Sequence, residues 1–131
     1  MARYLLDADT VSYALRGQGQ IAARILEHPP SELCISSITL AELGFGAEVK
    51  KSQKLRRAIR SFVSDVTVVP FDEAAAGRFA VVAAGLAKAG TPIGALDTLV
   101  AAQALSLGLT VVTNNTRPFS RVPGLKVENW L

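Results

Sequence analysis

Cysteine and histidine are almost absent from this 131-residue chain, which contains one residue of each type. The single cysteine, Cys34, excludes an internal disulfide and favours a reducing compartment. The single histidine, His28, makes a zinc site of the Cys and His type implausible, because such sites combine several of these ligands. It is also the only candidate base for a Ser-His-Asp arrangement. Zinc binding and covalent nucleophilic catalysis are therefore poor interpretations of this sequence.

Long apolar runs are absent too. No stretch approaches the roughly 20 apolar residues that a membrane-spanning helix requires. The first residues lack the charged region, apolar region and cleavage site of a secretory signal peptide. We therefore expect a cytoplasmic protein that does not associate with membranes. Half of the residues are hydrophobic and 19% are charged, which predicts a single domain over residues 1–131 rather than a disordered chain.

Positive charge is concentrated in one short segment, although the formal net charge is only +3. Six of the fourteen lysine and arginine residues lie within residues 50–60, and no acid occurs between Glu48 and Asp65. A basic stripe of this kind suits a polyanion such as nucleic acid. A solvated helix face is an equally good explanation of the same charges.

The hydrophobic pattern predicts strands that alternate with helices. The expected strands are residues 3–7, 32–36, 66–71, 109–114 and 125–130, and the expected helices are residues 9–15, 20–28, 38–51, 53–64, 73–90 and 94–108. The N-caps that we expect are Asp9 or Thr10, Ser37, and Asp72. The last long helix is expected to bury one face made of Leu96, Leu99, Val100, Gln103, Ala104 and Leu107. Such alternation predicts a parallel sheet between helix layers, with a functional site beyond the carboxyl ends of the strands.

Four polar side chains stand in apolar surroundings close to these strand ends or helix starts. Asp7 ends the first strand, and Glu42 lies near the start of the helix that follows the second. Asp97 lies in the first turn of the helix at residues 94–108, and Asn115 follows the strand at residues 109–114. Parallel strands bring such positions to one edge of the sheet. Taken singly, each acid also fits a helix cap or a stabilising charge at a helix N-terminus.

Three carboxylates gathered at one edge repel one another and need a cation to remain ionised. Hard oxygen ligands in an open site select Mg²⁺, with Mn²⁺ as the alternative. A bound Mg²⁺ keeps several waters and leaves places for phosphate oxygens. The residues therefore predict metal-assisted hydrolysis of a phosphodiester.

A glycine motif in the chain is only a weak signal of dinucleotide binding. Gly44 and Gly46 in GFGAEV form a G-x-G, but the third glycine of a dinucleotide-binding loop is missing and no strand leads directly into the motif. A Mg²⁺-dependent phosphatase is a further alternative, but it needs a phosphate-cradling loop that the sequence does not contain.

Four segments occur together and in order: LLDADTVSYAL, SSITLAELGFG, PIGALDTLVAAQAL and VVTNNTRPFSRVPGLKVENW. With these segments the chain resembles the PIN-domain ribonucleases, and most closely the VapC-type toxins of bacterial type II toxin–antitoxin (VapBC) modules. The resemblance covers nearly the whole chain. It implies a PIN-like three-layer α/β/α sandwich with a central, mainly parallel sheet of about five short strands. It also implies a Mg²⁺- or Mn²⁺-dependent endoribonuclease, a homodimer, and a cognate VapB-type antitoxin whose C-terminal segment blocks the active site, with a larger toxin–antitoxin assembly as an option.

The motifs of the family carry over residue by residue. Asp7 matches the first metal-binding aspartate, Glu42 the acid of T-x-A-E-L, and Asp97 the acid that opens D-x-L-I-A-A. Asn115 stands where many PIN domains have a fourth acid. We expect Asp7 and Asp97 to bind the metal, and Glu42 to bridge to it or to orient the attacking water. Asn115 is expected to hold the water shell.

Two further residues are expected to support the site from outside the metal ligands. Asp9 occupies a position where the family usually has an amide, and it either caps the next helix or faces the site. Thr113 is expected to assist the ligands. Because Asn115 cannot ionise, the sequence favours one metal over two. The residues expected to hold the RNA backbone are Lys50, Lys51, Lys54, Arg57 and Arg117.

A second class of function remains open alongside the nuclease. In this alternative the chain is a catalytically weak PIN-like module that acts by binding a partner or RNA, and its acidic pocket only holds a partner's arginine. The presence of all three acids, Asp7, Glu42 and Asp97, argues against it, because a degenerate site is expected to lose one of them.

Overall fold

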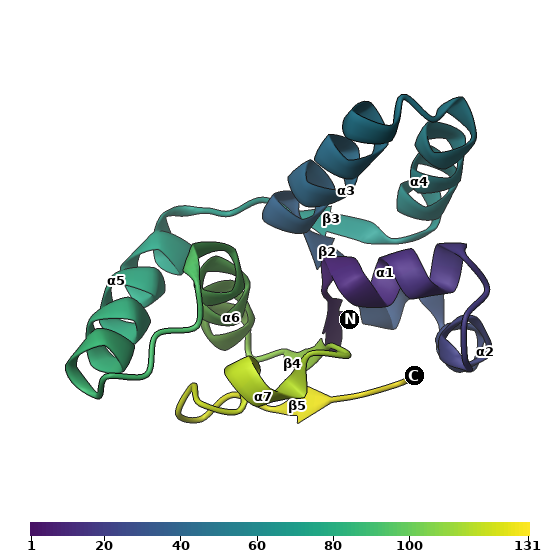
Figure 1. The fold of residues 1–131 in the computed structure, drawn as a ribbon. Helices are drawn as coiled ribbons and strands as arrows, with labels where there is room; N and C mark the ends of the chain where they lie inside the picture. Colours follow the sequence, from purple (N-terminus) through teal and green to yellow (C-terminus); the bar gives the residue numbers. More distant parts are fainter.

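A five-stranded parallel sheet forms the middle layer of the computed structural model, which describes all 131 residues (Figure 1). The strand order is β3-β2-β1-β4-β5, so the first strand is central, and every pair of neighbours is parallel. The strands are β1 (Tyr4–Leu6), β2 (Leu33–Ser36), β3 (Thr67–Val69), β4 (Thr110–Val112) and β5 (Val127–Glu128). The predicted α/β/α class is confirmed.

Helices cover both faces of this sheet and connect its strands. They are α1 (Ala8–Leu15), α2 (Ile21–Leu26), α3 (Ser37–Lys50), α4 (Gln53–Asp65), α5 (Glu73–Lys88), α6 (Ala95–Leu107) and α7 (Thr116–Phe119), with a 3₁₀ turn at Pro30–Glu32. The 3₁₀ turn and α7 were not predicted, because three or four residues are too few to show a helical period. None of the helices combines the length and apolar character needed to span a bilayer.

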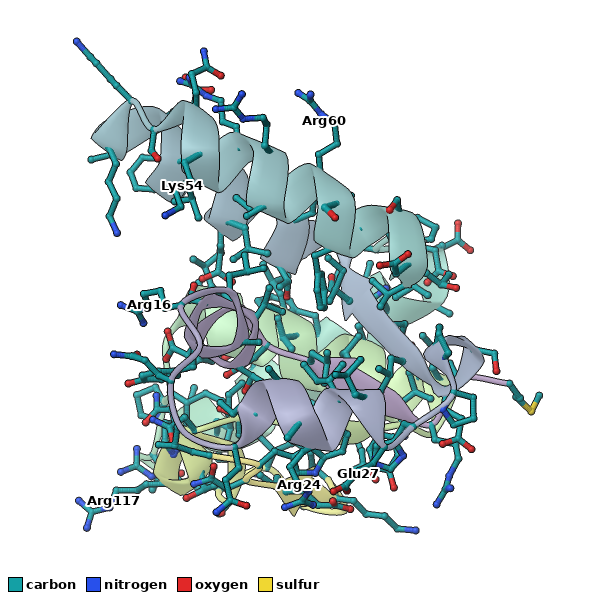
Figure 2. All side chains as sticks on the ribbon, turned by 90° about the vertical axis from the view of Figure 1, so that its right-hand side faces the viewer. Arg16, Arg24, Glu27, Lys54, Arg60 and Arg117 are labelled. Carbon is teal, nitrogen blue, oxygen red and sulfur yellow. The ribbon has the colours of Figure 1, made fainter.

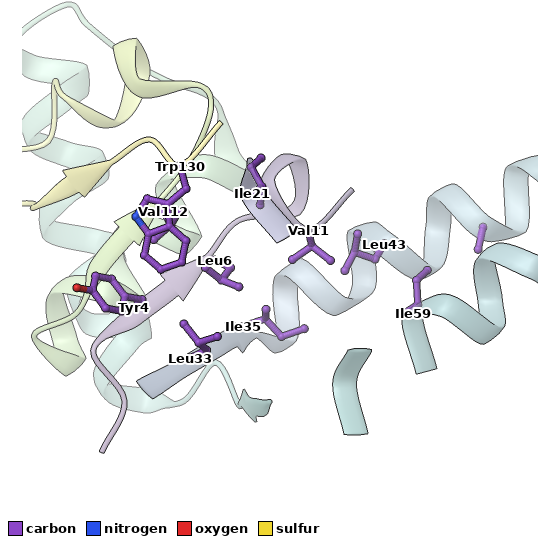
Figure 3. Packing of buried hydrophobic residues seen from close by; sticks show 11 residues of the cluster. Tyr4, Leu6, Val11, Ile21, Leu33, Ile35, Leu43, Ile59, Val112 and Trp130 are labelled. Carbon is purple, nitrogen blue, oxygen red and sulfur yellow. The ribbon is translucent and has the colours of Figure 1, made fainter. Parts of the chain in front are cut away.

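The strand β1 supplies both halves of the hydrophobic core. Tyr4 and Leu6 belong to a cluster that includes residues of α1, α2, α3 and α4, whereas Leu5 belongs to a second cluster with residues of α6 and α5. Figure 3 shows the first cluster, in which Trp130 near the C-terminus packs with Tyr4. A strand buried on both faces has no polar face to show, which explains the continuous apolar run at its start. Asp7, directly after this strand, is the first polar residue at its carboxyl end.

The helices that follow β1 and β2 each begin one residue earlier than the sequence predicted. Asp7 caps α1, because its Oδ1 accepts a hydrogen bond from the backbone N–H of Thr10 at 2.9 Å. The prediction of Asp9 or Thr10 as this cap is therefore wrong. Ser36 rather than Ser37 caps α3. Both caps have an extended backbone. Ser36 is the last residue of β2, and Asp7 is the single residue between β1 and α1.

The helix α6 packs through small residues rather than through its leucines. Ala101, Ala102 and Ala104 are fully buried, whereas Leu96 and Leu107 are about half exposed. The expected apolar face is therefore correct only in part. Because α6 lies against α5 and also contributes to the core beside the sheet, alanines allow a closer approach than leucines.

Candidate active site

Four carboxylates line one small cavity at the carboxyl edge of the sheet. The cavity measures about 40 Å³, and its acids are Asp7, Asp9, Glu42 and Asp97. Asp7 lies directly after β1 and Asp9 in the first turn of α1, while Glu42 comes from α3 and Asp97 from the first turn of α6. The structure thus brings the three acids of the sequence analysis together, and Asp9, expected either to cap the helix or to face the site, lines the same cavity. A cavity of this size holds a water or a small ion with part of its hydration shell.

Asp7 is the most firmly held of these acids. Only 6% of the residue is exposed, and both of its carboxylate oxygens accept hydrogen bonds. Oδ1 accepts from the backbone N–H of Thr10, and Oδ2 accepts from the hydroxyl of Thr113. The Thr113 oxygen in turn accepts from the backbone N–H of Asn115 at 2.9 Å. Since a hydroxyl has a single proton, this second contact directs the Thr113 proton to Asp7.

Thr10 is a residue of the site that the sequence analysis missed. Its backbone N–H holds Asp7, and its hydroxyl donates to the carbonyl of Val112 at 3.0 Å. The residue therefore connects the start of α1 to the end of β4. An aspartate directly before a helical pattern is a capping signal, and it points to the backbone N–H two or three residues later.

The carboxylates raise one another's pKa values. Burial raises the pKa of Asp7 most, and the Asp9 charge adds to it, while hydrogen bonds from Thr113 and Thr10 act in the opposite direction. Burial also raises the pKa of Glu42, followed by the charges of Asp97, Asp7 and Asp9. The pKa of Asp97 is raised by burial and then by Asp7 and Asp9. A cation in the cavity would reverse the effect of these like charges.

The donor chemistry of the cavity fits a hard divalent ion. All of its polar side chains are carboxylates, and no group of three Cys, His, Asp or Glu residues is already close enough to enclose a metal. Mg²⁺ does not need a closed protein cage, because it retains waters and takes one or two carboxylates. Asp7 and Asp97 are suitable ligands, since both are at least partly buried and face the same cavity.

Asn115 takes part in the site through its backbone. The residue is exposed and does not line the acidic cavity, and its N–H donates to Thr113. The side-chain amide that the sequence analysis placed near the metal is thus not brought to the carboxylates here.

The basic residues do not form one continuous patch. Figure 2 shows Arg60 and Arg117 at opposite edges of the molecule, and Figure 1 places α1 between α4 and α7. Arg56 is held by Glu48 at 3.0 Å. Lys51, Lys54 and Arg57 are exposed and do not line the acidic cavity. Nor do they line a neighbouring cavity that shares Ala8, Asp9 and Glu42 with it. Lys50 lines this neighbouring cavity.

Known proteins with a similar sequence are named as endonucleases or ribonucleases. A family model described as the PIN domain matches residues 4–125. The chain is 37% identical over 131 residues to the tRNA(fMet)-specific endonuclease VapC of Salmonella typhimurium, with 99% of each chain covered. It is 39% identical over 133 residues to the protein of the same name from Shigella flexneri, again with 99% of each covered. A chain in the crystal structure of DNA bound VapBC from Salmonella typhimurium has a TM-score of 0.90, 38% identity and complete coverage of both chains.

Proposed function

Because this chain belongs to the PIN-domain family and is a ribonuclease of the VapC type, we propose that it acts as a Mg²⁺-dependent endoribonuclease toxin that a cognate VapB-type antitoxin neutralises. The observation that carries this proposal is the single cavity lined by Asp7, Glu42 and Asp97. Carboxylates from three separate segments meet there at the edge where parallel sheets place their sites.

Asp7 and Asp97 would hold the metal in this mechanism. A bound Mg²⁺ supplies a water of lowered pKa and stabilises the negative charge that develops on the phosphate. The role of the chain is to fix the ligand geometry, and Asp7 is fixed best, by the hydrogen bonds from Thr10 and Thr113. Partners of this kind raise the precision of a metal site and the affinity for the ion.

Glu42 would orient the attacking water and accept its proton. It is half-buried beside Asp97 and Asp7, and its pKa is raised from the usual value of a glutamate. An ionised carboxylate that lines the same cavity as the metal ligands can hold the attacking water and accept its proton. The amide side chain of Asn115 cannot take over this role, because an amide does not accept a proton.

The first substrate to test is tRNA(fMet), because the similar endonucleases of Salmonella typhimurium and Shigella flexneri are named for it. Exposed basic residues on α4, together with Arg117 on α7, would contact the RNA backbone. Such contacts weaken as salt rises, because each neutralised phosphate releases counterions.

We also propose two protein partners. The solved structure with a TM-score of 0.90 is that of a VapBC assembly, which supports a VapB-type antitoxin for this chain. Co-purification with a small protein encoded next to this gene tests it, and a gene with no such neighbour contradicts it. A homodimer is the expected state of the toxin, and sedimentation that shows only monomer at micromolar concentration would overturn that expectation.

The nuclease proposal is tested with purified protein, tRNA(fMet) and total cellular RNA, in Mg²⁺, Mn²⁺ or EDTA. We expect cleavage in either metal, none in EDTA, and none by Asp7→Asn. Cleavage that survives both chelation and Asp7→Asn would overturn the metal mechanism. Mapping of new 5′ ends after brief expression of the wild type and of Asp97→Asn then identifies the substrate. Tight antitoxin binding by a protein that cleaves no RNA would favour the binding module instead.

A further inference from the structure

The helix α3 carries an acid, a glycine and a lysine along one face. Glu42, Gly46 and Lys50 are spaced by four residues, which places them one above another on a helix. Lys50 therefore lies about 12 Å from Glu42 along the helix axis, at a rise of about 1.5 Å per residue. All three residues line a second cavity of about 220 Å³.

This second cavity adjoins the acidic one. The two share Ala8, Asp9 and Glu42 in their linings, so a molecule bound at the carboxylates can extend into it. Leu43 of α3 and Leu55 and Ile59 of α4 make the apolar part of its wall. Away from the acidic end, Lys50 is its only charged group.

Gly46 is the residue that keeps this space open. It lies inside α3, where glycine lowers helix stability relative to alanine, and its backbone φ is not in the positive range that would require glycine. A Cβ built on Gly46 meets no atom within 4 Å. The fold thus has room for a side chain at this position, and such a side chain would take up space in the cavity.

Lys50 is free to bind an anion. It makes no ion pair, whereas nearby Arg56 is held by Glu48. The cavity therefore offers a metal site at one end, an apolar wall in the middle and a free ammonium group at the other end. A cationic peptide side chain would be attracted to the acids but repelled by Lys50. A nucleotide complements all three parts, because its phosphates are anionic and its base has an apolar face.

We propose that this cavity is a nucleotide subsite, in which the base next to the scissile phosphate packs on Leu43, Leu55 and Ile59 while Lys50 binds a neighbouring phosphate. Gly46 leaves the room for that base. The inference rests on the proposed ribonuclease function, and it makes α3 a source of substrate selectivity as well as of Glu42.

The test compares Gly46→Leu with Gly44→Leu. Gly44 lies in the same helix, and a Cβ there is also free of contacts within 4 Å, but Gly44 lines a different cavity that contains none of the site's acids. Both variants replace a helix glycine by a better helix former, so circular dichroism and thermal melting are expected to show both folded. We expect kcat/KM for RNA cleavage in Mg²⁺ to fall at least tenfold in Gly46→Leu and to stay within twofold of wild type in Gly44→Leu.

Two further readouts separate base binding from damage to the catalytic acids. RNA affinity in EDTA, measured by fluorescence anisotropy, should weaken in Gly46→Leu but not in Gly44→Leu. Synthetic RNAs that carry the mapped cleavage site, with each flanking nucleotide made abasic in turn, should reveal one position at which the wild type loses about tenfold. Gly46→Leu should lose nothing more at that position, because its subsite is already blocked.

The possible results separate the two proposals. If the wild type cleaves no RNA, both the ribonuclease function and the subsite are overturned. Equal cleavage by wild type and Gly46→Leu overturns the subsite alone. A ratio of wild-type to Gly46→Leu cleavage rates that is the same on intact and abasic RNA overturns it too. A Gly46→Leu variant that cleaves RNA normally but no longer binds the antitoxin would show a peptide in the cavity and would also overturn it. Should Gly46→Leu fail to fold, Lys50→Ala decides, with a salt slope of RNA binding smaller by about one if the proposal holds and unchanged if it does not.

Discussion

The hydroxyl of Thr113 donates a hydrogen bond to Asp7 Oδ2 across a sequence separation of 106 residues. Both residues are buried, and the backbone N–H of Asn115 fixes the direction of the hydroxyl. The acid at the end of β1 is therefore oriented by the residue that follows β4, its neighbour in the sheet. The strand pairing and the geometry of the site depend on each other.

Loss of this hydroxyl should weaken the site without unfolding the protein. We expect Thr113→Val to lower metal affinity or RNA cleavage by about 10–100-fold, because removing a partner of a metal ligand usually has this effect. Thr113→Ser, which keeps the hydroxyl, should remain close to wild type. Steady-state kinetics at several Mg²⁺ concentrations measures both, and equal activity of the valine and serine variants would show that the hydrogen bond does not matter.

Asp7 and Asp9 should differ strongly, although both line the acidic cavity. Asp7→Asn should abolish cleavage, because a buried and hydrogen-bonded carboxylate would be replaced by a neutral amide. Asp9 is exposed and accepts no hydrogen bond, so Asp9→Asn should remain active with a shifted optimum of metal concentration. Cleavage of the same RNA over a Mg²⁺ series tests the pair. Equal loss in both variants would mean that Asp9 is itself a ligand.

The metal-free protein should become less stable as the pH rises from the acid range. Burial and like charges raise the folded-state pKa values of Asp7, Glu42 and Asp97 above ordinary values of 3.8 or 4.5. The stability contributed by these groups is full below their unfolded-state pKa values and is lost as the pH rises through the folded-state values. Asp97→Asn should therefore melt higher than wild type at pH 7 in EDTA, by a few degrees, since about 1 kcal/mol corresponds to roughly 4 °C in a domain of this size. A lower melting temperature for Asp97→Asn would contradict this reasoning.

Addition of Mg²⁺ should reverse that order. A ligand that binds only the folded state stabilises it by about 2.7 kcal/mol at a concentration one hundred times its Kd. The wild type should therefore gain melting temperature with Mg²⁺, while Asp97→Asn should gain little. Differential scanning fluorimetry with Mg²⁺ and then EDTA measures both, and a Mg²⁺ response of equal size in the two proteins would remove Asp97 from the ligands.

Asn115→Ala should have a smaller effect than Thr113→Val. The contact of Asn115 with the site is its backbone N–H, which alanine retains, and its side chain does not line the acidic cavity. We expect a decrease in kcat/KM of less than about threefold. A loss as large as that of Thr113→Val would mean that the amide side chain turns toward the metal when RNA or metal is bound.

Most of the architecture could be predicted because it follows from periodicity. Five strands, the long helices and the convergence of Asp7, Glu42 and Asp97 depend on apolar patterns and on the geometry of parallel sheets. The prediction had no access to side-chain direction. The sequence places Asn115 as close to the strand end as Thr113, yet only the threonine is buried against Asp7.

The division of labour between Asp7 and Asp9 shows a second limit. A sequence argument treats capping and metal binding as competing roles. Asp7 can fill both, because it caps α1 through a single hydrogen bond to Oδ1 and each carboxylate oxygen has a further lone pair. Nor could Gly46 be assigned from its motif, because the space beside it is created by α4. Such features arise from tertiary contacts and have no local signal.

The central position of β1 has a consequence for how the chain is made. The strand β4, which pairs with β1 on one side, and Thr113, which orients Asp7, are synthesised more than a hundred residues after β1 and Asp7. A growing chain therefore carries all four cavity-lining acids, Asp7, Asp9, Glu42 and Asp97, before Thr113 is present to orient Asp7. The full set of contacts that orients Asp7 therefore forms only after the chain has been extended past Thr113.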